Sequence, residues 1–489
     1  MTASIYRDLA SIVGSNRTSN EQELLEQFIG GTGTDETCSP SLVVWPSSAE
    51  EVSRIVEFAN KNRFPLIPVS SGLPRMSGST IPKVKGTVII DFRKMNRIIR
   101  VDAKNKVVMI EPGVTYSQLL PELKKAGLRP LMPLLPKATQ SVLASCVDRE
   151  PITIPRFHWD ASDPLLCTET VFGTGEMLRT GSASGPGTLE EQWASGQAQK
   201  NPMGPSQFDP FRLVQGSQGA IGIVTWITMK CEVAPVTHRI YLAGSDSLES
   251  LQAFNYAILR RRLIDEHFML NSRCLSEMLG RDIQSSLPEW ILVTGISGHG
   301  PLAQEEFDYR LADTKDVAAS AGVGLELEAG NVTANDILSF LNLPSSEPYW
   351  KVRTFGGCRE VSFVSTLDKM PELYTLFLNE AEKSGVDRER VGAYVQPIVQ
   401  GVNTYSCFDI YYDPQQEQEA SSMETLFVNG SERLMDAGAF FSRPPDALRK
   451  AIYSRVSPEV LSAMNRVKQI FDPNNILSPG NLCFEEAIE

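Results

Sequence analysis

The spacing of apolar residues predicts an amphipathic helix over residues 47–63, S-S-A-E-E-V-S-R-I-V-E-F-A-N-K-N-R. The apolar residues that share one face of this helix are Val52, Ile55, Val56 and Ala59. A serine precedes two glutamates at its start, which is the pattern of a capped first turn. The same spacing predicts a short helix near the N-terminus, at Ile5, Leu9, Ile12 and Val13.

A turn of small residues follows a short apolar strand at residues 65–69 and reads S-S-G-L-P-R-M-S-G-S-T. Two further strands are expected at residues 88–91 and 107–111. Small side chains let successive backbone N–H groups converge on an anion, so the turn suits a pyrophosphate. It matches neither the G-x-G-x-x-G pattern nor the G-K-[ST] pattern. An ordinary serine- and glycine-rich surface turn is the alternative.

The remaining pattern predicts an α+β chain. We expect a helix near residues 116–126, an extended L-R-P-L-M-P-L-L-P-K segment, a hairpin at 166–180 and a long ordered loop over 181–210. A strand should then end near Cys231. Beyond it, strands at 240–243, 290–295, 392–398 and 407–412 should alternate with helices at 247–263, 301–321 and 368–384. The tail should be helical up to a D-P-N-N turn.

Composition is that of a globular protein with about two to four domains' worth of core in 489 residues. The net charge of −13 argues against a nucleic-acid-binding protein. We see no membrane-spanning segment, and the first residues lack the apolar core of a secretory signal, so we expect a cytoplasmic protein.

The eight cysteines are scattered without a C-x-x-C pair, and the four histidines have no metal-ligand spacing. This pattern argues against an iron–sulfur cluster or a structural zinc site in the chain. Free thiols in a reducing compartment are the simplest interpretation. We therefore expect no metal site, and any redox chemistry must come from a bound organic cofactor.

Several segments occur in a fixed order: V-V-W-P-S-S-A-E-E-V, the small-residue turn, D-F-R-K-M-N-R-I-I-R-V-D, E-P-G-V-T-Y, S-V-L-A-S-C-V-D-R, G-S-Q-G-A-I-G-I-V-T and D-P-N-N-I-L-S-P-G. In this order the chain resembles the FAD-binding family of vanillyl-alcohol oxidase and p-cresol methylhydroxylase. That family also contains glycolate and D-lactate dehydrogenase flavoproteins. The resemblance implies an α+β fold. A two-subdomain FAD-binding domain would span residues 1–235, a substrate-binding cap 236–445, and a C-terminal segment, 446–489, would return to the first domain.

The resemblance also implies where FAD would bind. The backbone of the turn would meet the pyrophosphate, two further segments would line the other side of the cofactor, and the tail would close over the flavin ring. Gly222 would permit close approach of the backbone. The expected cofactor-binding residues are Ser70, Ser71, Gly72, Leu73, Pro74, Arg75, Met76, Ser77, Gly78, Ala144, Ser145, Cys146, Gly219, Gly222, Ile223, Val224 and Asn481.

Arg443 stands where the phenol-oxidising relatives carry a tyrosine–arginine pair. Its guanidinium would bind a phenolate or carboxylate, or stabilise charge on the reduced flavin; a structural ion pair is the alternative. The expected tyrosines are replaced by Ser442 and Ser77, which weakens a simple phenol pocket. Tyr405 lies near a family position that can bond covalently to the flavin, with a residue facing the substrate cavity as the alternative.

Asp160, with Asp163 as a rival, falls near the carboxylate that phenol oxidisers place beside the flavin. It would accept a proton or activate water, unless it is only a turn residue. His158 is a second base candidate, although a packed histidine is the commoner role. Arg353 and Arg359 are candidates for binding an anionic substrate.

The chain is thus expected to be an FAD-dependent dehydrogenase or oxidase that takes a hydride from an activated C–H carbon. The first hypothesis is an aromatic substrate, a p-alkylphenol or benzylic alcohol. The second is a D-2-hydroxy acid, weakened because no histidine follows His299 to form the metal site of lactate and glycolate dehydrogenases. The third is an FAD-carrying electron-transfer subunit of a larger complex. We expect an oligomer and a separate acceptor: a cytochrome, an iron–sulfur subunit, an electron-transfer flavoprotein or dioxygen.

Overall fold

The helix predicted over residues 47–63 forms as α3 (Ala49–Asn62) in the computed structural model, which describes residues 2–29, 39–155, 163–204 and 209–486. The Ser48 hydroxyl caps it by accepting a hydrogen bond from the Glu51 amide. Its apolar face is fully buried. The helix therefore forms for the reasons that the sequence indicates.

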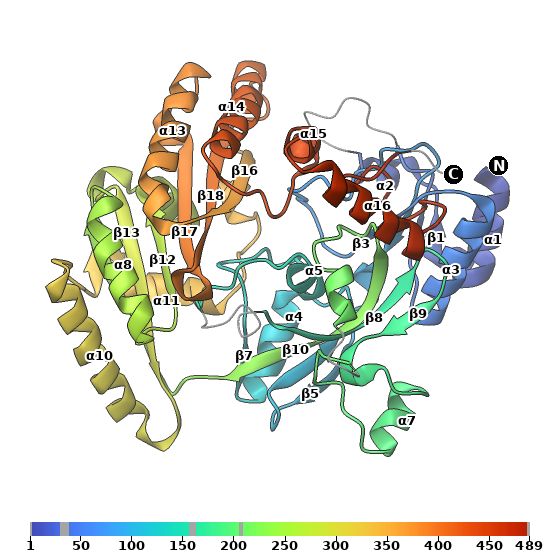
Figure 1. Ribbon diagram of the computed structural model, residues 1–489, viewed down its shortest axis with the longest axis horizontal. Helices are drawn as coiled ribbons and strands as arrows, with labels where there is room; N and C mark the ends of the chain where they lie inside the picture. The colour runs from blue at the N-terminus through green and yellow to red at the C-terminus, as the bar shows by residue number, and fades with distance from the viewer. Residues whose placement is uncertain (1, 30–38, 156–162, 205–208, 487–489) are drawn as a thin grey trace.

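The N-terminal part of the chain contains a sheet with the strand order β1-β2-β4-β3, in which β4 pairs in parallel with both β2 and β3. Its strands are β1 (Thr18–Ser19), β2 (Leu42–Val44), β3 (Leu66–Val69) and β4 (Val88–Asp91). The helices beside it are α1 (Thr2–Val13), α2 (Gln22–Glu26) and α3, at the blue end of the chain in Figure 1. The predicted N-terminal helix is confirmed.

A second, antiparallel sheet has the order β5-β6-β10-β8-β9, with β7 also paired to β10. Its strands are β5 (Ile98–Asp102), β6 (Val107–Ile110), β7 (Leu128–Pro130), β8 (Leu165–Phe172), β9 (Met177–Arg179) and β10 (Gly222–Val233). The helices of this part are α4 (Tyr116–Lys125), α5 (Val142–Val147) and α7 (Leu189–Ala194). The long strand β10 leads from this sheet into the next part of the chain (Figure 1).

That next part, which we call the cap, contains an antiparallel sheet with the order β11-β13-β12-β17-β18-β16. Its strands are β11 (Thr237–Ser245), β12 (His267–Asn271), β13 (Trp290–Gly298), β16 (Gly357–Ser365), β17 (Val391–Ile398) and β18 (Asn403–Tyr412). A small separate pair is formed by β14 (Glu328–Ala329) and β15 (Val332–Thr333).

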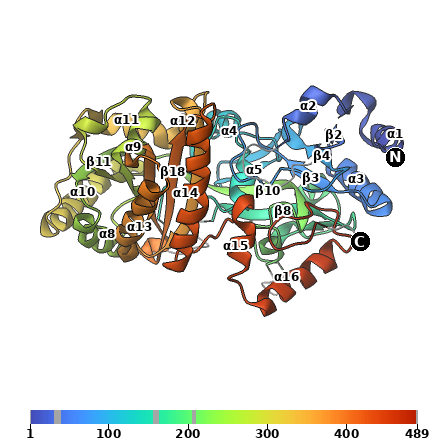
Figure 2. The same cartoon turned by 90° about the horizontal axis from the view of Figure 1, so that it is seen from above.

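Helices cover both faces of the cap sheet. One face packs against α8 (Glu249–Arg261), α10 (Ala303–Ser320), α13 (Met370–Lys383) and α14 (Glu417–Asp436). The other face packs against α9 (Ser272–Leu279), α11 (Ala334–Asn342) and α12 (Trp350–Arg353). Figure 2 shows the cap beside the two N-terminal sheets.

The C-terminal segment returns to the N-terminal sheets through α15 (Arg449–Tyr453) and α16 (Pro458–Phe471) (Figure 2). Its return is fixed by Lys468, whose buried ammonium donates to Asp472 (2.5 Å) and to the carbonyls of Ala220 (2.6 Å) and Leu477 (2.8 Å). A buried ammonium needs such partners to offset its desolvation. The tail is therefore tied to the turn that precedes β10.

Most of the predicted elements are confirmed, and the whole is an α+β fold. One expectation was wrong: residues 181–210 are not simply a loop, because Thr188 and Glu191 form a capping box that starts α7. Strands β2, β5, β12 and β16 and helices α9, α11 and α14 were not foreseen. The division into domains at residues 235 and 445 stays a prediction.

Every cysteine in the described part of the chain carries a free thiol. None of the described helices has the length and apolar character needed to cross a bilayer.

Candidate functional site

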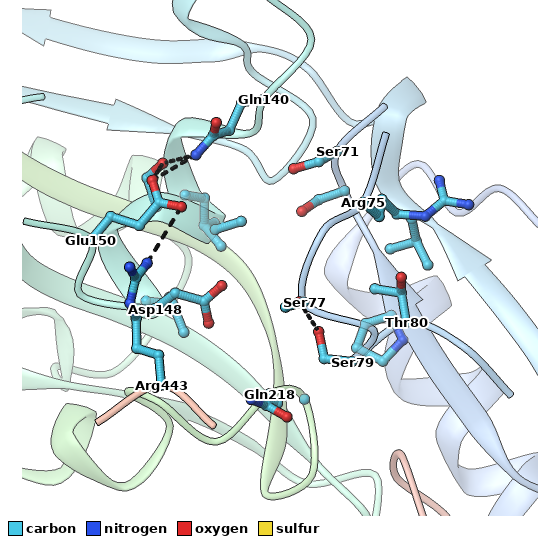
Figure 3. A pocket seen from close by; sticks show the side chains of 18 of the residues that line it. Ser71, Arg75, Ser77, Ser79, Thr80, Gln140, Asp148, Glu150, Gln218 and Arg443 are labelled. Carbon is cyan, nitrogen blue, oxygen red and sulfur yellow. Dashed lines mark hydrogen bonds and ion pairs between the residues drawn. The ribbon is translucent and has the colours of Figure 1, made fainter. Parts of the chain in front are cut away.

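A cavity of about 300 Å³ opens between the two N-terminal sheets and the cap (Figure 3). Three segments of the N-terminal part contribute to it: the turn after β3, the helix α5, and the turn that leads into β10. The cap contributes Glu360 and Ser362 from β16, and Arg443 comes from the segment after α14. The sequence segments singled out for cofactor binding thus meet at one cavity.

The turn after β3 offers free backbone donors to this cavity. Within the described chain, the backbone N–H groups of residue 73 and residues 75–80 donate to no protein acceptor. The Gly72 amide instead donates to the Thr139 carbonyl at 3.1 Å. A Cβ on Gly72 would lie 2.8 Å from the Thr139 Cβ, so glycine allows this close contact. A run of unpaired amides beside small side chains is suited to an anion such as a diphosphate.

Twelve of the predicted site residues line this cavity: Ser70, Ser71, Arg75, Met76, Ser77, Ala144, Ser145, Gly219, Gly222, Ile223, Val224 and Arg443. Others lie outside its lining: Gly72, Leu73, Pro74, Gly78, Cys146 and Asn481. Two more, His158 and Asp160, lie outside the described residues. Cofactor contact by the predicted residues remains a proposal.

Asn481 joins the two loops on opposite sides of the cavity. Its side-chain amide donates to the carbonyls of Ser79 (2.8 Å) and Gln218 (3.1 Å), and its oxygen accepts from Lys83. The residue is buried. Asn481 therefore holds the small-residue turn at a fixed distance from the turn before β10, and its role is in positioning these loops.

Two cations lie near the small-residue turn. Burial lowers the pKa of Arg75 to about 10, and its guanidinium contacts the Phe28 ring and the Gln27 carbonyl. Burial also lowers the pKa of Lys137, whose ammonium donates to the Pro74 carbonyl. Both residues line the cavity, but the Arg75 guanidinium points away from it, toward Phe28 (Figure 3), so the charge beside the turn is that of Lys137.

A smaller cavity of about 120 Å³ adjoins the first on the cap side. The two share the lining residues Gln140, Glu150, Tyr349, Glu360 and Arg443. The smaller cavity has aromatic and apolar walls, which include Leu270, Met278, Trp350, Tyr394 and Tyr405. Its charged lining consists of Glu150, Glu360, Asp409, Lys351 and Arg443.

Arg443 lies where the two cavities meet. Its guanidinium donates to the Tyr405 hydroxyl at 2.8 Å and lies 3.7 Å from a Glu150 carboxylate oxygen. The other oxygen of Glu150 accepts hydrogen bonds from Gln140 (2.6 Å) and Ser145 (2.7 Å) (Figure 3). Burial raises the pKa of Tyr405, although Arg443 opposes the shift, so the phenol keeps its proton near neutral pH.

Asp148, two residues before Glu150, lines the larger cavity. Burial and the nearby Glu150 charge raise its pKa to about 6, although Arg443 opposes this shift.

A buried ion cluster closes the far side of the smaller cavity. The Lys351 ammonium lies 2.5 Å from Glu360 and 2.8 Å from Asp409, and 3.8 Å from the Cys407 sulfur. Burial lowers the pKa of Lys351, but the carboxylates outweigh it and hold the pKa above its usual value. The ligand atoms of Glu360, Cys407 and Asp409 lie within 4.8 Å of one another. The ammonium contacts all three residues and offsets part of the charge of the two carboxylates.

Several site residues were missed from the sequence. Glu150, Lys351 and Glu360 had no recognisable motif, and Tyr394 and Tyr349 were not considered. Conversely, Arg353 and Arg359 line neither cavity. Arg353 donates a hydrogen bond to the Ser346 hydroxyl, and the Arg359 guanidinium lies over the Phe427 ring.

Comparisons with known proteins agree with this geometry. The model of the FAD binding domain family matches residues 40–181, and the model of the C-terminal domain of FAD linked oxidases matches residues 447–482. Among curated proteins, the chain is 23% identical to D-lactate dehydrogenase [cytochrome], mitochondrial, of Arabidopsis thaliana, covering 91% of this chain and 73% of that one. It is 23% identical to the 4-cresol dehydrogenase [hydroxylating] flavoprotein subunit of Pseudomonas putida (90% and 87%) and 26% identical to glycolate oxidase subunit GlcD of Bacillus subtilis (92% and 90%).

Among solved structures, p-cresol methylhydroxylase with substrate bound superposes with a TM-score of 0.84 at 18% identity, covering 99% of this chain and 97% of that one. The 4-ethylphenol oxidase of Gulosibacter chungangensis, in complex with isoeugenol, gives a TM-score of 0.82 at 19% identity with the same coverage. These likenesses show the fold.

The residues present fit FAD. The free amides of residues 75–80 suit its diphosphate, and the larger cavity extends from them to the cap, where the smaller cavity begins. The cofactor of this chain is FAD, and the chain is an FAD-dependent oxidoreductase.

Proposed function

Because the chain belongs to the FAD-dependent oxidoreductases of the vanillyl-alcohol oxidase and p-cresol methylhydroxylase family, we propose that it oxidises a neutral hydroxylated aromatic compound. The substrate class is a p-alkylphenol or a benzylic alcohol. The smaller cavity is its binding site, and the electrons pass to a separate acceptor.

The observation that carries the proposal is the grouping of Arg443, Tyr405 and Glu150. The Tyr405 hydroxyl accepts from Arg443, so its own proton is free for an oxygen in the cavity. Arg443 offers further N–H donors, and Glu150 offers an acceptor. A hydroxyl group both accepts and donates hydrogen bonds, whereas a carboxylate only accepts. The donors and the acceptor of Arg443, Tyr405 and Glu150 together therefore complement a hydroxyl group. The aromatic ring that carries this hydroxyl would lie between the aromatic walls.

The charges of the residues that line the smaller cavity also favour a neutral substrate. The described residues that line the smaller cavity include three carboxylates and two cations. The carboxylates are Glu150, Glu360 and Asp409, and the cations are Lys351 and Arg443. Arg443 is already faced by a carboxylate, and Lys351 by two. An anionic substrate would meet no excess of positive charge there, and like charges close together raise its binding free energy.

In the proposed reaction, bound FAD supplies the acceptor for the hydride that leaves the benzylic carbon. Tyr405 and Arg443 hold the substrate oxygen by hydrogen bonds and so fix the position of the ring while the C–H bond breaks. The aromatic walls orient the ring and exclude water. Asn481 and Lys468 keep the loops of the cofactor cavity in place.

A D-2-hydroxy acid is the second candidate, because two of the relatives described above are named D-lactate dehydrogenase and glycolate oxidase. For such a substrate Arg443 would pair with the carboxylate, and Glu150 would have to turn away. The third candidate is an FAD-carrying electron-transfer subunit that no small molecule reduces.

We propose a protein acceptor because one relative is named a flavoprotein subunit and another carries "cytochrome" in its name. A cytochrome, an iron–sulfur subunit and an electron-transfer flavoprotein all fit this role; dioxygen is the alternative. Covalent attachment of the flavin to Tyr405, an oligomeric state and a cytoplasmic location stay predictions.

The test is anaerobic mixing of the purified flavoprotein with p-cresol, 4-hydroxybenzyl alcohol, D-lactate and glycolate, followed by its visible spectrum. We expect the aromatic compounds to bleach the flavin. Bleaching by D-lactate or glycolate alone would establish the second candidate. An oxidised spectrum with all four would favour the electron-transfer subunit.

A further inference from the structure

We propose that Glu150 is the catalytic base of the reaction and takes the proton of the substrate hydroxyl on its open carboxylate oxygen. This inference rests on the proposed function, since it requires a hydroxylated substrate in the smaller cavity. It assigns a role to a residue that showed no motif in the sequence.

The two oxygens of Glu150 have different surroundings. Oε2 accepts from the Gln140 amide at 2.6 Å and from the Ser145 hydroxyl at 2.7 Å. Oε1 has Arg443 at 3.7 Å as its polar neighbour among the described residues, which is beyond a hydrogen bond. One oxygen is therefore held in place while the other remains able to accept a proton.

The position of this open oxygen is the second part of the argument. Glu150 lines both cavities, as Arg443 does, and Figure 3 shows the two side chains facing each other. Its backbone is fixed at the end of α5, where its amide donates to the Ser145 carbonyl at 3.0 Å. A substrate oxygen bound to Arg443 and Tyr405 would contact the same guanidinium that faces Oε1. Asp148, the neighbouring carboxylate, lines only the larger cavity.

The proton transfer balances as follows for a p-alkylphenol. The benzylic C–H bond breaks, and its hydrogen leaves with both electrons to the oxidised cofactor. The O–H bond breaks, its proton goes to Oε1, and its electron pair forms the C=O bond of a quinone methide. A phenol with a pKa of about 10 does not ionise on a carboxylate in the ground state. As the hydride leaves, the hydroxyl becomes far more acidic, so a carboxylate suffices as base.

This assignment has a consequence for the bound state. Because the Arg443 guanidinium already faces the Glu150 carboxylate at 3.7 Å, we expect the site to hold the phenol in its neutral form. Without that carboxylate, the uncompensated guanidinium favours the phenolate instead. The charged and titratable groups that face this position are Lys137, Asp148, Tyr349, Glu360, Tyr405 and Arg443.

The experiment compares the wild type with Glu150→Gln in anaerobic single turnover with p-cresol, from about pH 6 to about pH 10. The wild-type rate should be nearly independent of pH in this range. In the variant, flavin reduction should be about 10²–10³-fold slower at pH 7. It should then rise about tenfold per pH unit toward the pKa of the phenol, because only ionised substrate reacts.

A binding measurement supplies a readout besides activity. We use 4-chlorophenol, which has no benzylic hydrogen, and follow its ultraviolet difference spectrum at neutral pH. It should bind to the wild type as the phenol and to Glu150→Gln as the phenolate. Glu150→Asp keeps a carboxylate and should restore both the flat pH profile and the neutral ligand, at a lower rate. Glu122→Gln, an exposed carboxylate on α4, is the matched control.

Each result has a distinct meaning. If p-cresol reduces the wild type, and Glu150→Gln keeps the wild-type rate and pH profile, the assignment of Glu150 is wrong and the proposed function stands. Binding of 4-chlorophenol to the wild type as phenolate would also overturn it. If no phenol or benzylic alcohol reduces the wild type, the proposed function itself fails.

Discussion

The two sides of the larger cavity recognise their ligands in different ways. On the N-terminal side, consecutive residues of one turn offer backbone amides between small side chains. Where the larger cavity meets the smaller one on the cap side, Arg443, Tyr405 and Glu150 offer side-chain groups from three distant segments of the chain. Ligand binding on the N-terminal side depends on the path of the backbone. On the cap side it depends on the identity of individual side chains.

This difference explains how one fold supports different reactions. Backbone amides remain when a side chain of the turn changes, so the diphosphate side tolerates substitution as long as the turn keeps its shape. A single change at Arg443, Tyr405 or Glu150 removes a donor or an acceptor and alters which substrate fits. We therefore expect the substrate class to be decided by Arg443, Tyr405 and Glu150.

The largest effect is expected from Arg443→Ala, which removes the central donor of the cap side. We expect kcat/KM for p-cresol to fall about 10²–10³-fold, because the substrate oxygen loses its charged donor and Glu150 is left unpaired. FAD content, measured from the visible spectrum, should stay close to that of the wild type. Arg353→Ala is the control, since Arg353 lines neither cavity. Equal losses in both variants would contradict the role of Arg443.

The small-residue turn could be recognised from the sequence because its residues are contiguous. Strand, turn and small side chains follow one another between residues 65 and 80, and the physical reason for an anion site needs no distant contact. The function of Gly72 was less visible: its closeness to Thr139 depends on a segment almost seventy residues away.

The site residues on the cap side could not be predicted from the sequence in the same way. Glu360 faces Asp409 because β16 and β18 pair in that register, and Lys351 then joins them from α12. Arg443 was identified only through resemblance to a family. Tyr405 was singled out for a possible bond to the flavin, whereas its hydroxyl is bonded to Arg443 in the smaller cavity. Such contacts arise from tertiary packing, which residue spacing does not encode.

A second variant, Gly219→Val, tests the backbone side of the comparison. Gly219 has a φ of +75°, and a Cβ there would lie 2.7 Å from the Pro68 ring. The strain and the overlap should displace the turn before β10 and weaken FAD binding about 10–100-fold, as measured by fluorescence titration.

Gly86→Ala is the matched control for that variant, because Gly86 also has a positive φ (+84°) but open space around it. It should lose about 1 kcal/mol of stability and keep its affinity for FAD. If both variants bind FAD equally well, the turn before β10 does not shape the cofactor cavity.

The smallest effect concerns the cap alone. Burial lowers the pKa of His267 to about 3, and its ring lies between Asn255 (2.6 Å) and Thr294 (3.1 Å). Below pH 6.5 the unfolded chain therefore binds a proton that the folded chain does not, so stability falls as the pH decreases. Between about pH 6.5 and about pH 5 His267 should contribute a loss of about 2 kcal/mol, which the raised pKa of Asp148 partly offsets. Urea unfolding at the two pH values measures it.

In His267→Gln, which has no titrating ring, the loss between these pH values should be smaller by about that amount. His299→Gln, at a position that follows β13 and is not fully buried, should keep the wild-type dependence. Since His267 packs inside the cap and lines neither cavity, FAD content should not change in either variant. A pH dependence that survives in His267→Gln would show that the cap is destabilised by acid at some other group.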